Sequence, residues 1–99
     1  MIKRRFDSIF YREQFRALLA KYKVDRIAIF GTYALGRATQ KSDIDFLVKF
    51  KKGASLFDLV GLKLDLEDLL GKNVDIVTAN SLSKYIRRQV LKEAVYLYE

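Results

Sequence analysis

The sequence predicts an α/β (α+β) fold, in which a single mixed β-sheet is covered by helices. Segments with helical spacing alternate with short β-prone segments, in the order helix, strand, strand, helix, strand, helix. The first two strands are joined by about a dozen residues, which is near the minimum for a parallel crossover, so a mixed sheet is expected. The length of 99 residues predicts one domain, residues 1–99, with a single modest core.

The N-terminal half contains one predicted helix and two predicted strands. Apolar residues recur at helical spacing over residues 11–22, and Asp7 or Ser8 precedes them as a candidate N-cap. The stretches 26–30 and 44–50 are rich in β-branched and aromatic residues, which is typical of strands with a buried face.

The longest predicted helix begins after Ser55. Asp58 follows three residues later, which completes the pattern of a capping box, and Gly71 is a suitable residue to end the helix. The apolar residues of this helix that are expected to face the core are Leu56, Phe57, Val60, Leu64, Leu69 and Leu70.

The C-terminal part predicts a strand over residues 73–79 and a helix that starts near Ser81 or Ser83. The last apolar stretch, residues 95–98, has two interpretations, a short fourth strand or the apolar end of the preceding helix. If the third strand pairs beside the second, Asp75 lies next to any carboxylate at the start of that second strand.

The composition excludes several kinds of chemistry. The chain has no cysteine and no histidine, so disulfides, thiol nucleophiles, imidazole bases and ordinary zinc sites are excluded. The 19 Lys and Arg residues exceed the 12 Asp and Glu residues, and the net charge of +7 favours polyanionic partners such as nucleotides, RNA or an acidic protein surface. No recognised RNA-binding signature is present, so nucleic acid is not expected as a partner.

The sequence favours a cytoplasmic location. Its apolar runs are far shorter than a membrane span, and the stretch MIKRRFDSIFYREQF lacks the apolar segment of a signal peptide. We therefore expect neither membrane insertion nor secretion.

Two carboxylates stand at the start of the second predicted strand. Side chains alternate between the faces of a strand, so Asp43 and Asp45 project from the same face and repel each other unless a cation lies between them. Carboxylate and phosphate oxygens are the ligands that Mg²⁺ prefers, so a magnesium site is one interpretation. The alternative is that Asp43 caps a turn and Asp45 faces water.

Other residues favour the metal interpretation. Gly31 ends the preceding strand, and glycine allows backbone amides to approach a phosphate closely, while the hydroxyl of Thr32 can donate to a phosphate oxygen. Asp75 lies in an apolar strand, where a carboxylate is costly unless it is exposed, hydrogen-bonded or bound to a cation.

The spacing of these residues resembles a known family. The stretch GTYALGRATQKSDIDFLV has Gly-Thr, ten residues and then Asp-x-Asp, and it resembles the signature of nucleotidyltransferases of the DNA polymerase β superfamily. The stretch LEDLLGKNVDIVTANSL resembles the segment with the third carboxylate of that family. The small size is similar to that of the minimal nucleotidyltransferases, and the resemblance covers the chain from about Val24 onward.

The resemblance implies how the site works. Gly31 and Thr32 would hold the phosphates of ATP. Asp43, Asp45 and Asp75 would be the catalytic residues and the ligands of two Mg²⁺ ions. The implied reaction is in-line displacement at the α-phosphorus by a hydroxyl, with pyrophosphate as the leaving group. Paired metal ions make such a hydroxyl more acidic, which explains a site without histidine.

The resemblance also implies a partner. Minimal members of the family are commonly paired with small helical HEPN proteins as antitoxin and toxin, so the expected activity is adenylyl transfer from ATP to a tyrosine of such a toxin. The alternative is an antitoxin that neutralises its partner by contact alone. Transfer to a small molecule is disfavoured, because the enzymes that do so use an additional domain.

Two residues depart from the family pattern. Thr32 replaces the usual serine and keeps the hydroxyl, whereas Leu35 occupies a place where many members have arginine. Arg37 is a candidate to supply the missing charge. Neither departure affects the carboxylates.

Overall fold

The computed structural model describes residue 10 and residues 12–99 of the chain. Its elements are α2 (Glu13–Lys21), β1 (Val24–Phe30), β2 (Ile44–Phe50), α3 (Leu56–Leu70), β3 (Val74–Val77), the 3₁₀ turn η1 (Ala79–Ser81), α4 (Lys84–Glu93) and β4 (Val95–Tyr98). The strands form a sheet in the order β3-β2-β1-β4. β1 pairs antiparallel with β2 and with β4, whereas β2 and β3 are parallel, so the predicted mixed sheet is confirmed.

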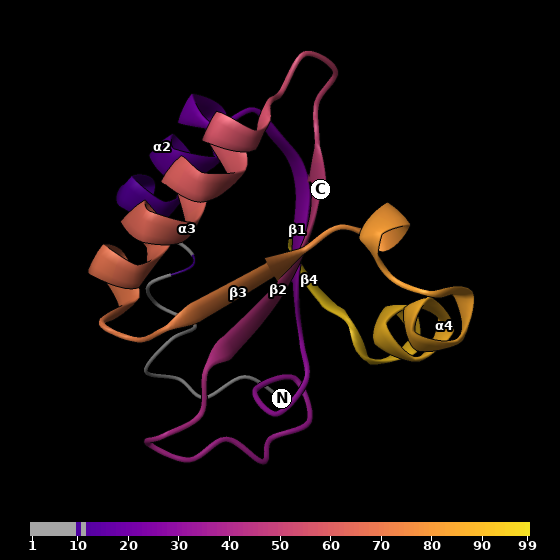
Figure 1. The fold of residues 1–99 in the computed structure, drawn as a ribbon. Coiled ribbons are helices and arrows are strands. Elements are labelled where there is room, and N and C mark those ends of the chain that lie inside the picture. Colours follow the sequence, from indigo (N-terminus) through magenta and orange to yellow (C-terminus); the bar gives the residue numbers. More distant parts are fainter. Residues whose placement is uncertain (1–9, 11) are drawn as a thin grey trace.

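Helices cover both faces of the sheet (Figure 1). α2 and α3 lie on one face, and α4 crosses the other. Along β2, Ile44, Phe46 and Val48 belong to the larger core on the side of α2 and α3, while Leu47 belongs to a smaller core with Val90 of α4. Because side chains alternate along a strand, Asp45 faces the side of α4.

The predicted core face of α3 was wrong for most of its residues. Four of the six are exposed: Leu56, Phe57, Val60 and Leu64. The buried residues of α3 are Leu62, Leu66 and Leu70, and Leu69 is partly buried against the core. α3 has apolar residues around most of its circumference, so helical spacing alone does not select the face that the sheet covers.

The ends of α3 agree with the prediction. The backbone N–H of Ser55 donates to Oδ2 of Asp58 at 2.8 Å, as in a capping box. Gly71 has φ of 67°, and its N–H donates to the carbonyl of Glu67 at 2.8 Å. The first predicted helix is shorter than expected, because α2 begins at Glu13. Tyr11 and the candidate caps at positions 7 and 8 lie outside the described residues.

The third strand ends earlier than predicted. Thr78 leaves the ladder because its carbonyl accepts from the backbone N–H of Ser81 at 3.1 Å, which forms η1. α4 starts after Ser83, one of the two predicted starts, and the Ser83 hydroxyl accepts from Ile86 N–H at 3.4 Å. Residues 95–98 form the strand β4, which was one of the two interpretations of this stretch, and they are not the end of the preceding helix. Among the described residues, no helix combines the length and apolar character needed to cross a membrane.

Candidate active site

The three predicted carboxylates lie at the starts of two parallel strands. Asp45 and Asp75 are partners in the register of β2 and β3, and Asp43 immediately precedes β2. Strand alternation places all three on the sheet face that α4 crosses. Asp43 and Asp75 are exposed, and Asp45 is partly buried. The condition under which Asp75 lies next to the other two carboxylates, that the third strand pairs beside the second, is therefore met.

The end of β1 brings Gly31 to the same place. Phe30 is the partner of Asp45 in the antiparallel register of β1 and β2, and Gly31 follows it. Gly31 has φ of 72°, which favours glycine, and a Cβ atom on it would lie 2.5 Å from Oδ2 of Asp45. The absence of a side chain at Gly31 therefore makes room for the Asp45 carboxylate.

The three carboxylates interact unfavourably in the absence of a cation. Burial raises the pKa of Asp45 above its usual value, and the negative charges of Asp75 and Asp43 raise it further. Among the described residues, the salt bridges join Lys21 to Asp65 and Lys63 to Glu67, so none of them neutralises this cluster. A bound cation would relieve the repulsion.

The donor set suits Mg²⁺, but the side chains are not gathered around a metal position. Within the part of the chain that the structure describes, no group of three or more acidic side chains is placed to hold a metal ion together. The available donors are hard carboxylate oxygens, and Mg²⁺ commonly takes one or two carboxylates together with phosphate oxygens. Asp43 and Asp45 are the residues that would hold such an ion, with Asp75 beside Asp45.

The connection after Gly31 is a series of hydrogen-bonded turns. The backbone N–H of Leu35 donates to the Gly31 carbonyl at 3.0 Å, and that of Arg37 donates to the Thr32 carbonyl at 2.8 Å. The Thr32 side chain is exposed, so its hydroxyl is accessible to a ligand. Leu35 and Arg37 are exposed as well, which leaves the guanidinium of Arg37 able to meet an anion near this turn.

A groove of about 1050 Å³ adjoins the carboxylates on one side. It is lined by Asp43, by residues 38–42 and by the end of α3 with the residues that follow it. Lys72 crosses part of this groove, where its Nζ donates to the Gln40 carbonyl at 2.7 Å and lies 5.8 Å from the centre of the Tyr33 ring. The groove includes Asp43 but not Asp45, Asp75, Gly31 or Thr32.

Sequence reasoning did not identify the residues beside the carboxylates at this edge. Lys72 and Asn73 directly precede β3, and Ser42 and Asp43 directly precede β2. The backbone N–H of Ile44 donates to the Asn73 carbonyl at 3.0 Å, so these two segments lie side by side. The available signal was the presence of polar residues directly before two adjacent strands. It is a weak signal, because polar residues commonly precede strands.

The fold is that of a nucleotidyltransferase. A model of the nucleotidyltransferase domain matches residues 11–97, so the chain belongs to this family, as the resemblance predicted. It is 49% identical over 78 residues to MJ0435 of Methanocaldococcus jannaschii, across 79% of this chain and 84% of that protein. MJ0435 is provisionally named a protein adenylyltransferase. It is 40% identical over 82 residues to protein adenylyltransferase MntA of Thermococcus cleftensis, across 83% of each chain.

Solved structures share the fold. One that is provisionally described as a minimal nucleotidyltransferase has a TM-score of 0.75 and 41% identity, over 92% of this chain and 87% of that one. A toxin–antitoxin structure with AMP-PNP has a TM-score of 0.71 and 28% identity, over 86% of this chain and 70% of that one. The complex of tri-AMPylated Shewanella oneidensis HEPN toxin with MNT antitoxin has a TM-score of 0.66 and 23% identity, over 93% of this chain and 71% of that one. This last similarity shows the fold alone.

Proposed function

We propose that this nucleotidyltransferase transfers AMP from ATP to a hydroxyl of a partner protein in a Mg²⁺-dependent reaction, and that it thereby acts as a cytoplasmic antitoxin. The observation that carries the proposal is the register of Asp45 with Asp75, next to Asp43 and against Gly31. Neighbouring carboxylates beside a glycine turn suit a cation and a triphosphate together. A surface that only binds a partner does not require neighbouring carboxylates that repel each other.

Each part of the site has a role in the proposed transfer. The turn at Gly31 and Thr32 holds the β- and γ-phosphates, which directs the α-phosphorus toward the start of β2. A hydroxyl oxygen of the acceptor forms a bond to the α-phosphorus, and the bond from that phosphorus to the bridging oxygen breaks. Pyrophosphate leaves with the electron pair, and the hydroxyl proton passes to Asp75 or to water.

Magnesium would supply charge neutralisation in this site. Asp43 and Asp45 would hold two ions, and Asp75 would hold the one nearer the attacking hydroxyl. When bound, the ions lower the pKa of that hydroxyl and stabilise the charge on the leaving oxygens. They would also offset the repulsion by Asp75 and Asp43, which adds to the effect of burial in raising the pKa of Asp45.

A tyrosine of a HEPN toxin is the proposed acceptor. The names of the relatives support a protein acceptor, since several are protein adenylyltransferases. The structure with AMP-PNP supports ATP as the donor. The same structure is a toxin–antitoxin structure at 28% identity, which supports a toxin as the partner.

A contact-only antitoxin is the second candidate. It is favoured by one observation, namely that no group of three acidic side chains in the described residues is placed to hold a metal ion. Asp43 and Asp75 are exposed, however, and exposed carboxylates change rotamer at little cost. We therefore place this candidate second.

The experiment uses the protein co-expressed with the product of the adjacent gene. The purified pair is incubated with labelled ATP and Mg²⁺, and the partner is analysed by mass spectrometry. We expect an added adenylyl group with the wild type and with Glu13→Gln, a charge-matched control on α2, but not with Asp45→Asn. If wild type and Asp45→Asn neutralise the partner equally and no adduct forms with any nucleotide, the contact-only candidate replaces the enzyme.

A further inference from the structure

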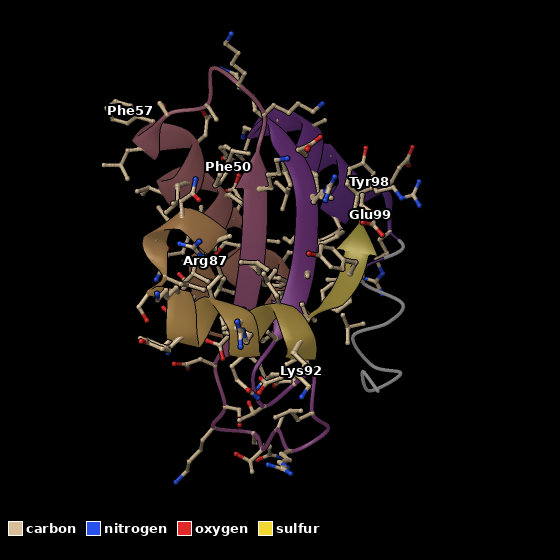
Figure 2. The ribbon with its side chains drawn as sticks, turned by 90° about the vertical axis from the view of Figure 1, so that its right-hand side faces the viewer. Phe50, Phe57, Arg87, Lys92, Tyr98 and Glu99 are labelled. Atoms are coloured by element: carbon tan, nitrogen blue, oxygen red, sulfur yellow. The ribbon has the colours of Figure 1, made fainter. Side chains whose placement is uncertain are left out.

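Part of the sheet face that carries the site has no helix over it. Figure 2 shows α4 crossing this face and leaving the half of the sheet toward Phe50 open. A groove of about 520 Å³ lies on this face beside α4, which is within the usual range of about 300–1,000 Å³ for ligand sites. Its lining includes Arg26, Leu47 and Lys49 from the sheet, Ala79 and Asn80 from η1, Leu91 from α4 and Tyr96 from β4.

Two cations lie side by side on the part of the sheet that lines this groove. Arg26 and Lys49 are direct partners in the antiparallel register of β1 and β2, and both side chains are exposed. Like charges at directly opposite positions destabilise a strand pair. Neither side chain makes a salt bridge or a side-chain hydrogen bond with another described residue. The sheet therefore carries a local positive charge at Arg26 and Lys49, and no salt bridge with another described residue neutralises it.

An apolar and aromatic surface accompanies the two cations. Tyr96, which pairs with Ala28 of β1, is 42% exposed, and Leu91 of α4 is 45% exposed. Aromatic and arginine side chains are the types that contribute most to protein interfaces. The combination suits a segment that has both carboxylates and an aromatic or aliphatic side chain.

The charges of the helices favour an acidic occupant for this face. The sequence of α4, KYIRRQVLKE, has four basic residues and one acidic residue. The sequence of α3 on the opposite face, LFDLVGLKLDLEDLL, has four acidic residues and one basic residue. A negatively charged surface is thus attracted to α4 and repelled from α3.

We propose that this groove docks an acidic surface segment of the protein acceptor, with carboxylates against Arg26 and Lys49 and an apolar side chain against Tyr96. The proposal rests on the proposed function, which requires a protein acceptor. Asp45 and Lys49 lie on the same face of β2, about 13 Å apart at about 3.3 Å per residue. An acceptor held in the groove therefore lies near the carboxylates, with α4 between the two contacts.

The test uses a dye-labelled peptide with one tyrosine among glutamates, measured by fluorescence anisotropy without nucleotide or magnesium. A second peptide has lysines in place of the glutamates, and a single-stranded RNA oligonucleotide is the third probe. We expect the wild type to bind the glutamate peptide, more weakly as salt rises, and not to bind the lysine peptide. Arg26→Glu and Lys49→Glu should each weaken binding by about fivefold or more.

The control variant is Arg16→Glu, which makes the same charge change at an exposed position of α2 on the opposite face. It should change the affinity by less than about twofold. Arg26→Gln and Lys49→Gln should weaken binding by a smaller factor, and they provide the comparison if a glutamate variant does not fold.

Three results would overturn the proposal. Equal loss of affinity in Arg16→Glu would show an effect of net charge alone. Tighter binding of the RNA, lost in the same two reversals, would assign the groove to nucleic acid. Self-association that the reversals abolish, seen by light scattering, would assign it to the acidic α3 of a second copy. Failure of the proposed function would look different from failure of this proposal. If no AMP transfer is detected but the wild type and Asp45→Asn both bind the glutamate peptide, the proposed function fails and the docking groove remains.

Discussion

The carboxylate of Asp45 lies against the backbone of Gly31, where a Cβ atom would be 2.5 Å from Oδ2. Gly31→Ala would place a methyl group there and would also force alanine to adopt a φ of 72°. The backbone strain costs about 1–2 kcal/mol and the overlap about 1–3 kcal/mol more. We expect the free energy of unfolding to fall by about 2–5 kcal/mol in urea denaturation, and nucleotide binding to be lost with the displaced carboxylate.

Gly36→Ala is the matched control for this prediction. Gly36 has nearly the same φ, 71°, but a Cβ atom there would have no neighbour within 4 Å. Only the backbone strain remains, so the loss should be about 1–2 kcal/mol, with nucleotide binding retained. Equal losses in the two variants would mean that the contact with Asp45 has no energetic consequence.

Asp45→Asn should stabilise the protein in the absence of metal. Burial and the charges of Asp75 and Asp43 disfavour the ionised form of Asp45, and asparagine keeps the shape without the charge. Because Asp45 is only partly buried, we expect a gain on the order of 1 kcal/mol or less at pH 7, seen as a rise of a few degrees in Tm with EDTA present. Glu13→Gln, away from the cluster, removes a favourable charge from the first turn of α2, so it should lower Tm slightly and not raise it.

The advantage of Asp45→Asn should depend on pH in a defined direction. The folded-state pKa of Asp45 is raised above its usual value of 3.8, so the folded protein binds this proton more tightly than the unfolded chain. Its protonated form favours folding at low pH, and that contribution is lost as the pH rises through the folded-state pKa. The difference in Tm between wild type and variant should therefore shrink as the pH falls to about 4 and below. A difference that grows at low pH would contradict the assignment.

The two faces of α3 should respond differently to truncation. Leu62 is fully buried, whereas Leu64, two residues later, is 56% exposed. Leu62→Ala should cost about 2–5 kcal/mol of unfolding free energy, and Leu64→Ala about 0.5 kcal/mol or less. Chemical denaturation of both variants tests this, and equal costs would show that the exposed leucine is covered in solution.

The positions of the predicted site residues in the fold could be inferred from the sequence because these residues lie at strand ends. The Gly-Thr turn and the alternation in IDFLVKF fix which end and which face hold Asp43 and Asp45. The pairing of Asp75 with Asp45 required the strand order as well, which the pattern of apolar residues does not determine.

The exposed and covered surfaces were harder to predict. The leucines of α3 surround most of the helix, so the choice of Leu62 and Leu66 for the core depends on the position of the sheet and not on spacing. The pairing of Arg26 with Lys49 likewise follows from the register of β1 and β2, which includes a bulge between Val24 and Arg26. A register shift of this kind leaves no clear signal in one sequence.

The hydroxyl of Thr32 should be needed for nucleotide binding. Thr32 is exposed in the turn after β1, beside the glycine that contacts Asp45. A hydrogen bond from a hydroxyl to a charged group contributes about 1.5–3 kcal/mol, so Thr32→Val should weaken ATP binding by roughly 10-fold or more. Valine has nearly the shape of threonine and lies at an exposed position, so the unfolding free energy should hardly change.

Thr32→Ser is the variant that separates the hydroxyl from the methyl group. Serine restores the donor, and we expect ATP affinity within about threefold of the wild type, measured by calorimetry with Mg²⁺ present. With EDTA in place of Mg²⁺, ATP should bind all three proteins weakly, because the carboxylates then repel the triphosphate. ATP that binds equally well with EDTA, or equally well to Thr32→Val, would show that the triphosphate does not occupy this turn in the way we propose.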